Sequence, residues 1–151
     1  MVTTRVDPVS LAAWRKMLTA HAELIDRLGK EMESATGLPL NWYEVLLYLV
    51  EAPDERLRMH QLAESLLLSR SAATRFVDRM ERAGLVERVP CTKDGRGTNV
   101  TLTPRGRAAF AAAAPVHLAG IRRHFADVID RDETLQLDSI MSKILRALRS
   151  T

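Results

Sequence analysis

The sequence lacks the features of a disulfide-rich, secreted or membrane-spanning protein. It has 151 residues and a single cysteine, Cys91, which excludes an intramolecular disulfide framework and agrees with a reducing compartment. No apolar run approaches the roughly 18 residues that a membrane-spanning helix needs. The N-terminus has no apolar segment typical of a signal peptide. We therefore expect a cytoplasmic protein that makes no use of a membrane.

The sequence also has few of the residue patterns that enzymes use. It contains no Gly-x-Ser-x-Gly, no His-Glu-x-x-His and no glycine-rich phosphate loop. The run 21–23, His-Ala-Glu, matches the first half of a zinc deaminase signature, but no Pro-Cys-x-x-Cys follows. His117 and His124 are seven residues apart, yet a zinc site needs more ligands than these two. We predict no enzymatic activity, no metal and no cofactor.

What is present is a basic amphipathic helix, predicted from Arg70 to Gly84 with Ser69 as its N-cap. One side is apolar, and the other side carries almost only polar residues and four arginines. We expect its N-terminal half to meet base edges and its later arginines to meet phosphates. The predicted DNA contacts of this helix are Ser69, Arg70, Ser71, Thr74, Arg75 and Arg79. The alternative is a solvated basic helix without a ligand.

The segments on either side of this helix favour a winged helix-turn-helix. Upstream, His60–Leu68 is a short amphipathic segment, and a tight break precedes Ser69. Downstream, residues 85–103 are predicted to form two strands around the tip Lys-Asp-Gly-Arg-Gly, at 93–97. Lys93 and Arg96 at this tip are predicted DNA contacts, Arg96 in the minor groove. The alternative is an exposed basic hairpin that binds nothing.

Positive charge is concentrated in the same region. Residues 69–107 hold nine Lys or Arg against four acidic residues, whereas the rest of the chain holds 13 against 15. Such a distribution is the electrostatic footprint expected for a polyanion partner. We therefore predict double-stranded DNA as a partner.

The sequence resembles the MarR family of bacterial transcription regulators over essentially the whole chain. The most specific similarities are Thr-Arg-x-Val-Asp-x-x-Glu-x-x-Gly-Leu-Val at 74–86, the pair Asp94 and Arg96, and Leu-Thr-Pro-x-Gly at 102–106. The resemblance implies that Ser69–Arg79 reads the major groove and that Arg96 enters the minor groove. One departure is the pair of tip glycines, where the family more often has a second arginine. Minor-groove contact would then depend on Arg96, with Lys93.

The ends of the chain indicate a homodimer. A narrow, mostly apolar stripe runs along a predicted helix of about 28 residues, which is too long for a small winged-helix module to cover. It comprises Leu11, Trp14, Leu18, His21, Ile25, Leu28, Met32 and Ala35. A second stripe, between residues 137 and 148, lies on the last predicted helix, capped by the acidic segment at 130–133. The alternative for the first stripe is burial within one chain.

We expect one domain, residues 1–151, that is mainly α with a small β-hairpin wing. Residues 41–103 form the winged helix-turn-helix, and residues 8–36 and 104–149 form dimerisation helices that, by resemblance, interlock about a two-fold axis. Thr103 is expected to cap a helix that begins at Pro104 and is kinked or interrupted at Pro115. Such a dimer reads a near-palindromic site with half-sites about one helical turn apart.

The resemblance also implies a small aromatic or amphipathic effector. A further helix is predicted from Asn41, with Glu44 completing a capping box. The effector-binding candidates are Trp14, His21, Trp42, Glu44 and His117. A urate-responsive subgroup uses a tryptophan, an acid and an arginine at places similar to Trp14, Glu44 and Arg75. Ordinary packing is the alternative role for each candidate.

The sequence therefore predicts a homodimeric repressor that is released from a promoter by a small molecule. Two alternatives remain open. One is a thiol-based redox sensor that uses Cys91, whose pKa Arg88 and Lys93 would lower. The other is a winged-helix module for protein association that has no effector.

Overall fold

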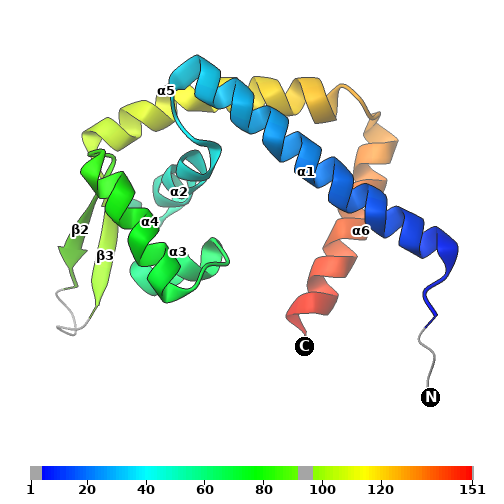
Figure 1. The fold of residues 1–151 in the computed structure, drawn as a ribbon, viewed down its shortest axis with the longest axis horizontal. Helices are drawn as coiled ribbons and strands as arrows, with labels where there is room; N and C mark the ends of the chain where they lie inside the picture. The colour runs from blue at the N-terminus through cyan, green and yellow to red at the C-terminus, as the bar shows by residue number, and fades with distance from the viewer. Residues whose placement is uncertain (1–4, 92–96, 151) are drawn as a thin grey trace. The chain divides into compact units, whose positions relative to one another are not determined.

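The computed structural model describes residues 5–91 and 97–150 of the chain (Figure 1). It is mostly helical with one small antiparallel sheet, which confirms the predicted fold class. The elements are α1 (Pro8–Thr36), α2 (Leu40–Glu51), η1 (Pro53–Glu55), β1 (Arg56–Arg58), α3 (Met59–Ser65), α4 (Arg70–Arg82), β2 (Val86–Pro90), β3 (Thr98–Leu102), α5 (Pro104–Ile121), the π-helical turn η2 (Arg122–Ala126) and α6 (Arg131–Arg149).

The chain forms two compact units. The central unit comprises residues 29–116, and the terminal unit comprises residues 1–28 and 117–151. Helices α1 and α5 each contribute to both units.

The central unit has a closed apolar core. Helix α2 and the apolar side of α4 supply most of it, together with alternate residues of β2 and β3. The buried residues of α4 are those that the helical periodicity places on one side, namely Ala73, Phe76, Val77 and Met80. Tyr43 of α2 stacks on Phe110 of α5, with ring centroids 5.2 Å apart. This packing leaves the opposite side of α4 in solvent.

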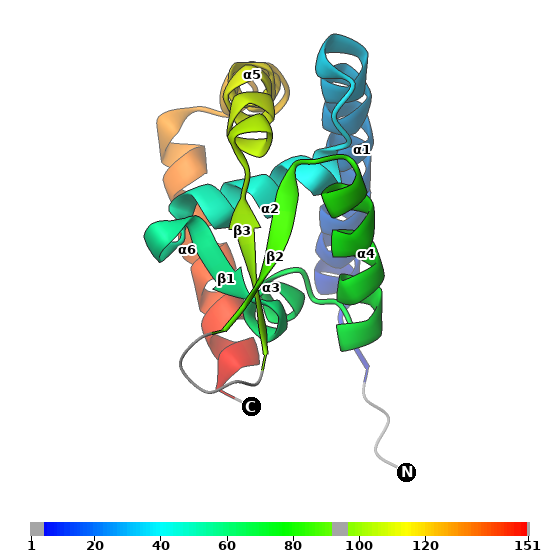
Figure 2. The ribbon, with the colours of Figure 1, turned by 90° about the vertical axis from the view of Figure 1, so that its left-hand side faces the viewer.

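The sheet has three strands in the order β1-β3-β2, and both pairings are antiparallel (Figure 2). The β2–β3 hairpin is the predicted one, with Val86 opposite Leu102 and Pro90 opposite Thr98. Strand β1 was not predicted, because its three residues, Arg-Leu-Arg, are too short to show a periodicity. Its Leu57 pairs with the buried Val100 of β3.

The predicted helix start at Thr103 is confirmed. The Thr103 side chain also links the end of α4 to the start of α5 through hydrogen bonds. The Thr103 hydroxyl donates to the carbonyl oxygen of Gly84 (2.7 Å) and accepts from the N–H of Gly106 (2.9 Å). Gly84 has a φ of 77°, which favours glycine. A Cβ atom on Gly106 would lie 2.0 Å from the carbonyl oxygen of Leu85, so only glycine fits here without a shift.

The terminal unit has its apolar residues largely on the outside. In α1, the exposed fractions of Trp14 and Leu18 are 55% and 48%, whereas Leu28 and Met32 further along are buried. The first stripe is thus not buried within one chain between Leu11 and Ile25. Helix α6 has no buried residue among those described, and Ile140, Ile144, Leu145 and Leu148 are exposed. Its predicted acidic cap is present, because Asp130 and Glu133 form a capping box.

Two local predictions are wrong. Helix α2 begins at Leu40 with Pro39 as its N-cap, so Asn41 and Glu44 form no capping box. The carbonyl oxygen of Pro39 instead accepts from the N–H groups of Trp42 and Tyr43. Helix α5 is not interrupted at Pro115 but continues to Ile121, where the π-helical turn η2 follows. Among the described residues, no helix is both long and apolar enough to cross a bilayer.

Candidate nucleic-acid interface

The polar side of α4 is the most exposed basic surface that the sequence predicted. Arg70, Ser71, Thr74, Arg75 and Arg79 are all exposed, while the residues on the opposite side of the helical wheel are buried. Because the buried side fixes how α4 packs, these five side chains project from a rigid element. Figure 2 shows α4 as a straight helix beside the sheet of the central unit.

Short-range hydrogen bonds order the N-terminal turn of α4. The Ser69 hydroxyl accepts from the N–H of Ala72 (3.2 Å), which confirms Ser69 as the N-cap. The same oxygen lies 3.3 Å from the Ser71 hydroxyl. The Thr74 hydroxyl donates to the carbonyl oxygen of Arg70 (2.9 Å), so its lone pairs remain available to accept from a base or a water. The N-terminal turn of α4 is therefore ordered by its own hydrogen bonds.

The arginines of α4 differ in how they are held. The Arg79 guanidinium lies over the Phe76 ring, 5.5 Å from its centroid, and Arg82 Nε donates to the carbonyl oxygen of Asp78 (3.3 Å). Arg75 has no hydrogen bond or ion pair to any residue that the structure describes. Its donors are thus available for a bidentate contact with a base.

The turn between α3 and α4 has the geometry that the helix-turn-helix prediction requires. Helix α3 ends at Ser65, and the N–H of Leu68 returns to the carbonyl oxygen of Ala63 (2.9 Å). Leu67 reverses the chain direction with a φ of 54°. Ala63 and Leu62 are buried against the core, so α3 supports α4 from behind.

Sequence reasoning missed the structural role of Arg88, which it considered only as a positive charge and as a neighbour of Cys91. In β2, Arg88 forms ion pairs with Asp78 (2.7 Å) and Glu81 (2.6 Å) of α4. Its guanidinium also donates to the carbonyl oxygen of Thr74, and its backbone N–H donates to Glu81, both at 3.0 Å. Arg88 therefore links β2 to α4 and neutralises the negative charge of the two acidic residues near the basic surface. The signal in the sequence was the spacing of two acids on one helix turn, at 78 and 81.

The predicted wing contacts Lys93 and Arg96 lie outside the described residues. The strands that lead to them are in place, and the N–H of Cys91 donates to the carbonyl oxygen of Gly97 (3.1 Å) across the base of the hairpin. Cys91 is buried with an exposed fraction of 9%, and its expected neighbour Arg88 is occupied by Asp78 and Glu81.

The effector candidates are divided between the units. Trp14, His21 and His117 belong to the terminal unit, and Trp42 and Glu44 belong to the central unit. Glu44 is exposed and accepts from the Tyr48 hydroxyl (3.4 Å). Burial raises the pKa of Tyr48, with the negative charge of Glu44 as a second cause. Burial lowers the pKa of His117, because the charged imidazolium loses hydration.

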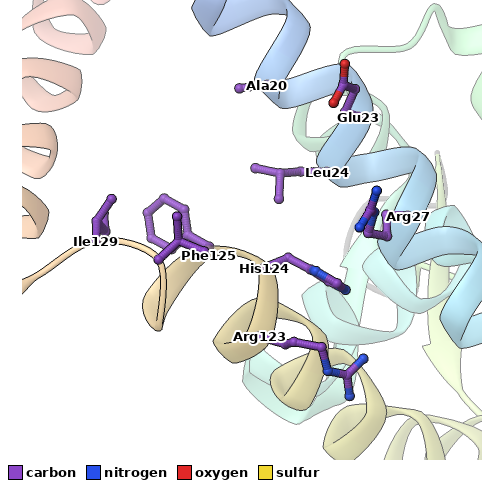
Figure 3. Close-up of a pocket in the computed structure, with 9 residues that line it drawn as sticks. Ala20, Glu23, Leu24, Arg27, Arg123, His124, Phe125 and Ile129 are labelled. Carbon is purple, nitrogen blue, oxygen red and sulfur yellow. The ribbon is translucent and has the colours of Figure 1, made fainter.

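A pocket of about 480 Å³ lies within the terminal unit, between α1 and the η2 region (Figure 3). Its walls combine the apolar side chains of Leu24, Phe125 and Ile129 with the basic side chains of Arg27 and Arg123. None of the five effector candidates lines this pocket. Among the residues that the structure describes, no group of three or more His, Cys, Asp or Glu is placed to hold a metal ion.

Comparison with known proteins shows what this arrangement is. The model of the MarR family matches residues 36–97. AbsC, a MarR family transcriptional regulator from Streptomyces coelicolor, is 34% identical with a TM-score of 0.90, over 99% of this chain and all of that one. Sco3205 is a MarR family regulator from the same organism that was crystallised with DNA. It is 30% identical with a TM-score of 0.88, over 95% of this chain and 91% of that one.

A relative among characterised proteins is the transcriptional repressor YetL from Bacillus subtilis. It is 27% identical over 99 residues, which are 66% of this chain and 59% of YetL. These relatives and structural neighbours are transcription regulators and not enzymes. With the helix-turn-helix, the hairpin and the basic side of α4 in place, the chain belongs to the MarR family of DNA-binding transcription regulators.

Proposed function

We propose that the protein is a cytoplasmic homodimeric repressor that binds a near-palindromic promoter site and leaves it when a small aromatic or amphipathic molecule binds. The observation that carries the proposal is the exposed side of α4, where four arginines and two hydroxyl residues lie on a helix whose other side is buried. A relative named as a repressor supports the direction of regulation.

The DNA contacts that we propose are divided by chemistry. Arg70, Ser71 and Arg75 lie on the first turns of α4 and carry donors for the acceptor groups of major-groove base edges, and the Thr74 hydroxyl can accept from a base. Arg79 lies further along the helix, where its side chain suits a contact with a phosphate. Ser69 precedes the helix and serves as its N-cap. Lys93 and Arg96 remain proposed contacts of the wing tip.

Dimerisation is proposed from the terminal unit. Trp14, Leu18 and Ile25 on α1 and five large aliphatic side chains on α6 are exposed. Exposed apolar stripes of this length mark surfaces that bind a partner, and a second copy of the chain presents the same stripes. Two copies then present two α4 helices to two half-sites.

Release by a ligand requires that the ligand bind the arrangement unable to bind DNA more tightly than the DNA-bound one. Trp14, His21, Trp42, Glu44 and His117 are the proposed effector contacts. Oxidation of Cys91 is less well supported as a trigger, because reactive cysteines are accessible and this thiol is buried.

The test is selection of bound sequences from a random double-stranded DNA pool, followed by titration of the selected site at several salt concentrations. We expect enrichment of a near-palindrome whose half-sites are about 10 base pairs apart. The selected DNA then serves as a probe in a screen for small molecules that release the protein. Weak binding without any enriched sequence, lost at moderate salt, would contradict the proposal and favour a protein-association role.

A further inference from the structure

A cationic cleft lies beside α4, and it shares only Arg70 and Thr74 with the residues assigned to base reading. It has a volume of about 460 Å³, and three separate segments of the central unit line it. They are the β1–α3 junction, the first turn of α4 and the base of the wing. The cleft is lined by Arg58, His60, Arg70, Thr74, Arg88 and Thr98 among others.

The described residues that line the cleft include three arginines and no carboxylate. Arg88 is offset by Asp78 and Glu81, at 2.7 and 2.6 Å. The other two arginines are Arg58 and Arg70. The imidazole of His60 and the hydroxyl of Thr98 add further donors. A cleft of this kind suits an anion that accepts several hydrogen bonds, such as a phosphate.

The position of the cleft on α4 identifies the source of that phosphate. At about 100° per residue, Arg70 and Thr74 lie on one edge of the polar side of α4, and Arg79 lies roughly 140° to 180° away on the other edge. A helix in the major groove lies between the two sugar-phosphate backbones that border it. The edge with Arg79 then faces one backbone, and the cleft faces the other.

We propose that Arg58, His60 and Thr98 of this cleft bind a backbone phosphate of the DNA strand opposite the one that Arg79 contacts. This inference rests on the proposed function, since it requires α4 to lie in the major groove. It adds Arg58, His60 and Thr98 to the interface. These three contacts carry no base information, and they fix the rotation of α4 about its own axis.

Arg58→Gln tests the proposal, with the selected DNA site as the probe. Losing one phosphate contact lowers the slope of log affinity against log salt by about 0.9. Between 50 and 200 mM salt the wild type should therefore lose about threefold to fourfold more affinity than the variant. The preference for the selected site over a shuffled one should not change. Arg58→Lys keeps the charge and should retain the wild-type slope.

Arg105→Gln is the matched control, because Arg105 is an exposed arginine of the central unit that does not line the cleft. A second readout places single methylphosphonates, which are uncharged, along the site. One position should weaken the wild type and leave Arg58→Gln unaffected, whereas Arg105→Gln should remain sensitive to it.

An unchanged salt slope in Arg58→Gln, or equal losses in Arg58→Gln and Arg105→Gln, would overturn the proposal. So would the absence of a methylphosphonate position whose effect depends on Arg58. If the wild type selects a site and these tests fail, only the phosphate cleft is wrong. If the wild type selects no site, the proposed function and the cleft both fail.

Discussion

The two units use apolar helical residues in opposite ways. In the central unit, Leu46, Leu49 and Met80 are fully buried, and the exposed sides of the helices are polar. In the terminal unit, Trp14, Leu18 and the aliphatic residues of α6 are exposed. Helix α1 contains both situations, because its Met32 is buried in the core of the central unit while its Trp14 is 55% exposed.

This difference separates a unit that completes its own core from one whose apolar residues remain exposed in a single chain. The central unit buries its apolar residues within one chain, so its remaining exposed groups are free to serve recognition. In the proposed dimer, burial against a second copy would remove the apolar surface of the terminal unit from water at about 25 cal/mol per Å². Four predictions test this division.

The largest effect is expected in the core of the central unit. Leu46→Ala removes a fully buried side chain and should lower the free energy of unfolding by about 2–5 kcal/mol, because of lost transfer energy and a residual cavity. Urea denaturation followed by circular dichroism measures the loss. Leu145→Ala is the control, since the same change occurs at a 48% exposed site of α6. An equal loss of unfolding free energy in Leu46→Ala and Leu145→Ala would contradict the contrast between the two units.

The next effect concerns the apolar stripe of α1. Leu18→Glu should raise the dimer dissociation constant by at least about tenfold, because a charge buried at an interface without a partner costs well over 1 kcal/mol. Sedimentation equilibrium measures this change. Thr19→Glu introduces the same charge on an exposed position away from the stripe and should leave the constant unchanged. An unaffected dimer in Leu18→Glu would show that the stripe is not the interface.

A similar or smaller effect is expected at the exposed side of α4. Arg75→Ala should lower the preference for the selected site over a shuffled site by about tenfold to a hundredfold, since a bidentate base contact is worth about 1–3 kcal/mol. Competition binding with both DNAs measures the preference. Arg79→Ala serves as the control and should weaken binding to both DNAs equally, with a salt slope lower by about one. If Arg75→Ala discriminates as well as the wild type, its assignment to base reading is incorrect.

The smallest effect is a pH dependence that arises from His117, where the C-terminal segment of the terminal unit begins. Burial lowers the pKa of His117 from its ordinary value of 6.5, so the folded protein binds fewer protons than the unfolded chain in this range. The contribution to stability is therefore complete above pH 6.5 and is lost as the pH falls through the lowered pKa. Urea unfolding at a series of pH values should show this decrease, and His117→Gln should remove it. The same decrease in both proteins would assign it to other groups.

Much of the fold could be predicted from sequence because its signals are local. The amphipathic period of α4, the Ser69 cap and the alternation in β3 each lie within one element, and the structure reproduces them. The failures have physical causes that a single element does not reveal. Pro39 displaced the cap expected at Asn41, and β1 is too short to show a period.

The contacts of the interface were less predictable than its elements. Arg88 joins Asp78 and Glu81 across ten and seven residues, so the pairing depends on how β2 lies against α4. The cleft around Arg58 depends on three segments that meet only in the folded central unit. The effector candidates were chosen by residue type alone, and the structure distributes them over both units. They stay a prediction.

The most direct test of this account compares the binding of the protein to a full selected DNA site and to an isolated half-site. Stoichiometry is measured by sedimentation and affinity by titration at fixed salt. We predict two protomers on the full site, with an affinity well above that for the half-site, because the terminal unit couples two α4 helices. One protomer bound with the same affinity to both DNAs would contradict the account.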